Sequence, residues 1–89
     1  MSSLDITVTD AGGSVRKSVT VPNNAAAIKI IAALVDQLNL PLTSPDGTPM
    51  SYKFRHHELS SQISDSTTLA EAGVLNGHTL TLMPEIIAG

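Results

Sequence analysis

The chain has 89 residues, no cysteine, one tyrosine, one phenylalanine and a formal net charge of −3. This length fits one small domain with a single core. The absence of cysteine excludes disulfides, thiolate metal ligands and thiol nucleophiles. The sequence pI of about 5.3 argues against a nucleic-acid partner, which usually requires a basic stripe.

The N-terminal segment, residues 1–5, lacks the basic start and the apolar run of a signal peptide. No apolar stretch approaches the ~20 residues that are needed to span a bilayer. We therefore expect a cytoplasmic protein without membrane insertion.

Alternating residues at the start of the chain predict a β-hairpin. Leu4, Ile6 and Val8 alternate with polar residues up to Asp10, which is the pattern of a half-buried strand. The sequence Ala-Gly-Gly-Ser at 11–14 is a turn signal, and alternation resumes over residues 15–21.

The spacing of apolar residues becomes helical after Asn24. We predict one helix from Ala25 to about Asn39, with the Asn24 side chain as its N-cap. Apolar residues that lie three and four positions apart form a stripe along this helix, which we expect to pack on the hairpin. The stripe comprises Ile28, Ile31, Val35 and Leu38, flanked by Ala27 and Leu34.

The second half of the chain predicts a loop followed by more strands. Residues 40–49 contain three prolines and an Asp-Gly turn signal, which indicates an ordered loop. The next strand places Tyr52 and Phe54 in the core. The predicted elements are a strand at 50–57, a short edge strand around Leu59, one helical turn at 69–73 and a last strand at 78–83.

This order of elements predicts an α+β fold. One helix covers one face of a mixed sheet of four to five strands, which is the β-grasp arrangement. We expect the β-grasp domain to span residues 1–83, with residues 84–89 as an extended C-terminal tail.

The segment 67–89, TTLAEAGVLNGHTLTLMPEIIAG, resembles the end of ubiquitin and its relatives. Ubiquitin-like chains share the Thr-Leu start of the short turn, an apolar residue where Val74 stands, and alternating leucines in the last strand. The Asn-Gly pair at 76–77 and the long loop at 41–49 also resemble the bacterial ubiquitin-like proteins of type VII secretion loci.

The resemblance implies a bacterial protein modifier, and not an enzyme. In related modifiers an activating enzyme adenylates the terminal carboxylate with ATP, and the product passes through a thioester to a target lysine. Gly89 is the expected conjugation residue, although Ala88 stands where most relatives have glycine. The implied partners are activating and conjugating enzymes, a deconjugating protease and target lysines. No cofactor is expected. The tail that these enzymes would recognise comprises Pro84, Glu85, Ile86, Ile87 and Ala88.

Two other functions stay open. The chain could be a non-conjugated binding module, such as an accessory protein of a type VII secretion system, with an inert tail. It could also be a sulfur carrier, whose terminal glycine becomes a thiocarboxylate. Ile86 and Ile87 would enter an enzyme groove in a modifier, or would prolong the last strand in a binding module.

Strand alternation predicts a polar and locally basic sheet face opposite the helix. If Leu80 and Leu82 point inward, their neighbours in the last strand point outward. This face suits a partner with an acidic surface, although it could also be an ordinary solvated face. Its expected contact residues are Arg16, Lys53, Arg55, His57, Thr81 and Met83.

The histidines do not predict a metal site. His56 and His57 are neighbours in a strand, so their side chains point to opposite faces and cannot hold one ion. His78 lies elsewhere in the sequence. We expect solvent-exposed histidines at the strand end and no metal. No Gly-x-Ser-x-Gly motif points to a hydrolase.

Overall fold

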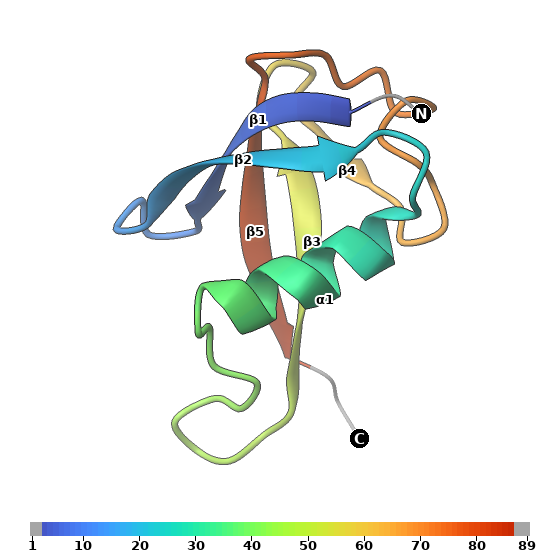
Figure 1. Ribbon diagram of the computed structural model, residues 1–89. Coiled ribbons are helices and arrows are strands. Elements are labelled where there is room, and N and C mark those ends of the chain that lie inside the picture. The colour runs from blue at the N-terminus through green and yellow to red at the C-terminus, as the bar shows by residue number, and fades with distance from the viewer. Residues whose placement is uncertain (1–2, 87–89) are drawn as a thin grey trace.

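One helix and five strands form the regular structure of residues 3–86, the part of the chain that the computed structural model describes. The strands form one sheet in the order β2-β1-β5-β3-β4, and α1 crosses one face of it (Figure 1). β1 and β5 are parallel, and the other pairs are antiparallel. The α+β, β-grasp prediction is thus confirmed. The elements are β1 (Ser3–Asp10), β2 (Arg16–Pro22), α1 (Ala27–Gln37), β3 (Met50–His56), β4 (Ser61–Ile63) and β5 (Thr79–Ile86).

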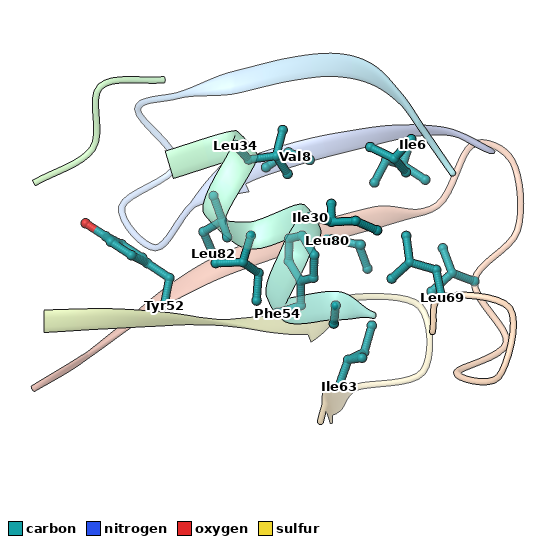
Figure 2. Packing of buried hydrophobic residues seen from close by; sticks show 14 of the residues in the cluster. Ile6, Val8, Ile30, Leu34, Tyr52, Phe54, Ile63, Leu69, Leu80 and Leu82 are labelled. Carbon is teal, nitrogen blue, oxygen red and sulfur yellow. The ribbon is translucent and has the colours of Figure 1, made fainter. Parts of the chain in front are cut away.

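The hydrophobic core lies between α1 and the sheet (Figure 2). Val8 of β1, Phe54 of β3 and both Leu80 and Leu82 of β5 are fully buried, as the alternation predicted. Tyr52 is buried as well, and its hydroxyl donates to the carbonyl of Pro41 at 2.8 Å, which holds the 38–49 loop against the core. Burying an apolar side chain of this size contributes roughly 1.5–3 kcal/mol.

The start of α1 differs from the prediction. Its N-cap is Ala26, which makes no side-chain hydrogen bond, so the prediction of Asn24 as the cap is wrong. The first two N–H groups of the helix donate instead to the carbonyls of Thr67 and Asp65, at 2.9 and 3.0 Å. A loop from the second half of the chain therefore accepts the hydrogen bonds that a capping side chain would accept. The residues near the start of the helix do not predict this contact.

The buried face of α1 is also rotated from the predicted stripe. Ile28 is 51% exposed, whereas Ile30 is only 5% exposed. The buried positions 27, 30, 31, 34 and 35 keep helical spacing, so the sequence allowed two apolar stripes. The small side chain of Ala27 permits the close approach to the 65–69 segment. The helix ends at Gln37, and Leu38 is only partly buried.

The segment between β3 and β5 contains two further differences. β4 begins at Ser61, two residues after Leu59, which is 57% exposed. The predicted helical turn at 69–73 is an irregular turn. Thr68 and Glu71 bond each other reciprocally: the Thr68 N–H donates to the carboxylate at 2.9 Å, and the Glu71 N–H donates to the hydroxyl at 3.1 Å. Within residues 3–86, no helix is long and apolar enough to cross a membrane.

Candidate functional site

The sheet face opposite α1 presents one row of side chains that crosses all five strands. The β-sheet register aligns one residue of each strand in this row. Neighbouring strands lie about 4.8 Å apart, so the two arginines of the row have Cα atoms about 14 Å apart. In strand order from β2 to β4 the row is Arg16, Thr9, Thr81, Arg55 and Gln62.

A hydroxyl pair forms the centre of this row. The Oγ1 atoms of Thr9 and Thr81 are 3.1 Å apart, and Thr9 is only 9% exposed. Arg16 and Arg55 at the two sides are exposed, and neither forms an ion pair within the described residues. Arg16 lines a hollow of about 380 Å³ together with Thr9 and Thr81. Arg55 lines another of about 200 Å³ together with Gln62 and Met83. The row thus offers, within residues 3–86, two guanidinium groups without an ion-pair partner on a polar surface.

The positive charge of Lys53 on this face is compensated by Asp65, which we did not expect. Its Nζ lies 2.6 Å from Oδ2 of Asp65, and the two side chains are 23% and 33% exposed. The hydrogen bond to Asp65 raises the pKa of Lys53, and the negative charges of Asp65 and Glu85 act in the same direction. Met83 lies opposite Lys53 in the β3–β5 ladder and is 39% exposed. His57 is exposed, and its N–H donates to the Thr79 carbonyl at 3.0 Å.

β5 continues past Met83, where we expected it to end. Pro84, Glu85 and Ile86 pair with residues 52, 51 and 50 of β3, so the strand includes half of the predicted tail. Ile87, Ala88 and Gly89 lie outside the described residues. The predicted roles of residues 84–88 in enzyme recognition and of Gly89 in conjugation stay predictions.

This pairing changes the distance over which Gly89 could act. Three residues beyond β5 extend to about 10 Å at most, whereas a free tail of six residues would extend to about 20 Å. An enzyme that acts on Gly89 would have to approach the end of β5 closely, or separate that end from β3.

A buried histidine pair lies near the other end of the β3–β5 ladder, and we did not predict it. His56 is 0% exposed, and its Nε2 is 2.8 Å from Nδ1 of His78. The expectation of a solvent-exposed strand-end histidine is therefore wrong for His56. Alternation places His56 on the same face as Phe54 and could have indicated its burial. Its contact with His78, 22 residues away, depends on the tertiary fold.

The histidine pair and Glu58 offer nitrogen and oxygen atoms that all lie within 4.8 Å of one another. These atoms already have hydrogen-bond partners, since the Leu75 N–H donates to Nδ1 of His78 at 3.2 Å and the Thr79 N–H donates to Glu58 at 2.9 Å. A metal-bound histidine usually donates its second ring N–H to an acceptor, and Nδ1 of His56 has no partner within residues 3–86. The geometry favours a hydrogen-bonded network, and the absence of a metal site stays a prediction.

The chain matches a family model described as "WXG100 protein secretion system (Wss), protein YukD" over residues 4–82. The chain belongs to the YukD family. The matched region begins in β1 and reaches Leu82 in β5, so it includes every element of the β-grasp core. No curated protein matches the sequence. As a ubiquitin-like domain of the YukD family, the chain is not an enzyme.

Solved structures show the same ubiquitin-like fold. Ubiquitin of Caldiarchaeum subterraneum is 24% identical, with a TM-score of 0.66, and the match covers 99% of this chain and 100% of that chain. A de novo designed protein based on ubiquitin is 20% identical, with a TM-score of 0.73 and coverages of 97% and 93%. A chain from a toluene 4-monooxygenase complex is 15% identical, with a TM-score of 0.72 and coverages of 94% and 100%. Similarity at these identities concerns the fold alone.

Proposed function

We propose that this member of the YukD family is a non-conjugated accessory module of a WXG100 protein secretion system, and that it binds another protein of that system in the cytoplasm. The family match over residues 4–82 carries the proposal, since the family description names this secretion system. Pairing of Pro84 to Ile86 with β3 supports a tail that is inert, because it removes half of the predicted free segment.

The outer sheet face is the proposed binding surface. Arg16 and Arg55 are exposed and have no ion-pair partner within the described residues. A guanidinium group binds a carboxylate through two parallel N–H donors, so the row selects a partner with two acidic side chains about 14 Å apart. His57, Thr81 and Met83 would complete the contact, and Met83 supplies apolar surface.

Charge reversal tests this surface. We would measure the affinity of the purified chain for each purified component of the secretion system by calorimetry. Arg16→Glu with Arg55→Glu should lower the affinity for the true partner by roughly tenfold or more per arginine, since hydrogen bonds between charged groups are worth about 1.5–3 kcal/mol. The double variant Lys17→Glu with Lys29→Glu makes the same change in net charge at exposed residues outside the row and is the matched control. Equal affinities of the arginine variant and the wild type would refute the binding surface.

The modifier hypothesis predicts a different result. No lysine or arginine follows Arg55, so trypsin would leave residues 56–89 attached to a modified lysine. Cleavage after Glu85 would instead leave Ile-Ile-Ala-Gly from residues 86–89 on the target. This remnant on target lysines, dependent on ATP and an activating enzyme, would overturn the proposed function. Full secretion by a strain whose chain lacks Gly89 would support it.

A further inference from the structure

The His56–His78 pair connects segments that are distant in sequence. His56 is the last residue of β3, and His78 immediately precedes β5. Nδ1 of His78 receives two donors, the His56 ring at 2.8 Å and the Leu75 N–H at 3.2 Å. The pair therefore joins the end of β3 to the turn that leads into β5.

The same turn also holds the start of β1. The Gly77 N–H donates to the Asp5 carbonyl at 2.7 Å, and the Asp5 N–H donates to Oδ1 of Asn76 at 2.9 Å. The Thr7 N–H donates to the His78 carbonyl at 3.0 Å. The position of the 75–78 turn thus affects how β1, β3 and β5 meet at this end of the sheet.

The hydrogen bonds determine where the ring protons lie. A backbone N–H can only donate, so Nδ1 of His78 must be an unprotonated acceptor when it binds the Leu75 N–H. The facing Nε2 of His56 must then carry the shared hydrogen. In neutral His56 the other nitrogen, Nδ1, is unprotonated, and this atom is buried without a hydrogen-bond partner within residues 3–86.

A positive charge on His56 is unfavourable in this environment. The second proton would have to bind Nδ1, where it would form a buried N–H without an acceptor. Two titratable groups face the ring: Glu58, 3.8 Å from Nε2, favours the charge, and His78 opposes it. Burial is the largest effect, and together with His78 it holds the pKa of His56 below its usual value of 6.5.

We propose that the buried His56–His78 pair is an acid-sensitive latch. It holds the 75–78 turn against the end of β3 while His56 is neutral, and protonation of His56 shifts the equilibrium toward an open state in which water reaches the charged ring. The proposal does not rest on the proposed function. It concerns the pairing of these rings and would hold whichever protein binds the outer face.

The direction of the pH effect follows from proton linkage. As the pH falls below 6.5, His56 binds a proton in the unfolded chain before it does so in the folded chain. The contribution of the latch is therefore complete above the unfolded pKa and is lost as the pH falls through the lower, folded pKa. Within that interval the unfolding equilibrium constant rises by up to about tenfold per pH unit. The carboxyl groups of Asp46, Glu58 and Glu71 have pKa values lowered from 3.8, 4.5 and 4.5, so they titrate below the range of about pH 7.5 to about pH 5 in which the latch is tested.

Urea unfolding of the full chain between about pH 7.5 and about pH 5 tests the latch. His56→Gln keeps a donor at the position of Nε2 but cannot bind a second proton. We expect the unfolding constant of the wild type to rise by up to about tenfold for each unit that the pH falls below 6.5. His56→Gln should take up one proton fewer on unfolding, so its unfolding constant should rise less steeply. His57→Gln, on the exposed face of the adjacent position, is the control and should keep the wild-type contribution of His56. Identical slopes for the wild type and His56→Gln would overturn the proposal.

A second measurement decides the matter even if His56→Gln does not fold. ¹⁵N spectra of the imidazole rings in the wild type report each tautomer and its titration. We expect His56 in the Nε2–H form, titrating below 6.5, together with faster exchange of the Leu75 amide as it titrates. A His56 ring that titrates at or above 6.5, or a Leu75 amide whose protection does not change, would refute the latch.

Discussion

Replacing Ile30 and Ile28 with alanine one at a time tests the orientation of α1 directly. Both are isoleucines in the same helix, yet Ile30 is 5% exposed and Ile28 is 51% exposed. Truncation of a buried isoleucine to alanine costs about 2–5 kcal/mol, through lost burial and the cavity that remains. Alanine also favours the helix over isoleucine by a few tenths of a kcal/mol, and this gain is common to both variants. We therefore expect Ile30→Ala to destabilise by about 2–4 kcal/mol and Ile28→Ala to stay within about 1 kcal/mol of the wild type.

Urea unfolding followed by far-ultraviolet circular dichroism measures the difference, and the chain has no tryptophan that would offer a simpler signal. A loss of about 3 kcal/mol is a large part of the roughly 5–15 kcal/mol that stabilises a small domain, so the midpoint should fall visibly. Equal losses for the two variants, or a larger loss for Ile28→Ala, would show that the helix face is assigned wrongly.

Two other predictions concern charged groups outside the latch. The pKa of Asp46 is lowered to about 2, mainly because its carboxylate accepts hydrogen bonds from the Ser44 hydroxyl and from Thr48. The stability that ionised Asp46 contributes is therefore present above pH 3.8 and is lost as the pH falls toward 2. Asp46→Asn should make stability less dependent on pH in that range, and NMR titration of the wild type should find the low pKa. Lys53→Met should change stability by less than about 1 kcal/mol, because the pair with Asp65 is partly exposed, and should leave partner binding unchanged in the calorimetric assay.

The sequence predicted most reliably where alternation and burial agree. Leu4, Ile6 and Val8 are buried as their period of two required, and the same rule placed Phe54 in the core. The rule also covers His56, two residues after Phe54, which is fully buried. The error came from treating histidine as a surface residue by type, although its position in the strand already placed it inward.

Helix orientation was ambiguous in the sequence for a physical reason. Ile28 and Ile30 are both apolar and each completes a stripe with helical spacing, so composition could not select between them. The choice is made by contacts that begin more than thirty residues later, where the carbonyls of Asp65 and Thr67 bind the first N–H groups of α1. A single-sequence pattern contains no information on that contact. The row from Arg16 to Gln62 was likewise predictable only in part: alternation placed its outward residues, but their alignment depends on strand order.

β5 continues through Pro84 to Ile86, although we expected the strand to end at Met83. The backbone N–H of His57 donates to the Thr79 carbonyl, and that of Thr7 donates to the His78 carbonyl. The backbone N–H and C=O groups of odd-numbered residues in β5 therefore face β3, and those of even-numbered residues face β1. Pro84 is even-numbered, so its backbone nitrogen faces the side of β1, but pairing between β1 and β5 already ends at Leu82. Its missing N–H therefore costs no ladder hydrogen bond, and pairing with β3 continues to Ile86. The proline also makes the open edge of β5 a poor template for another strand. Residues 84–86, which we expected to belong to a free tail, thus form a protected strand edge. Any enzyme that uses Gly89 must work beyond this edge or separate it from β3.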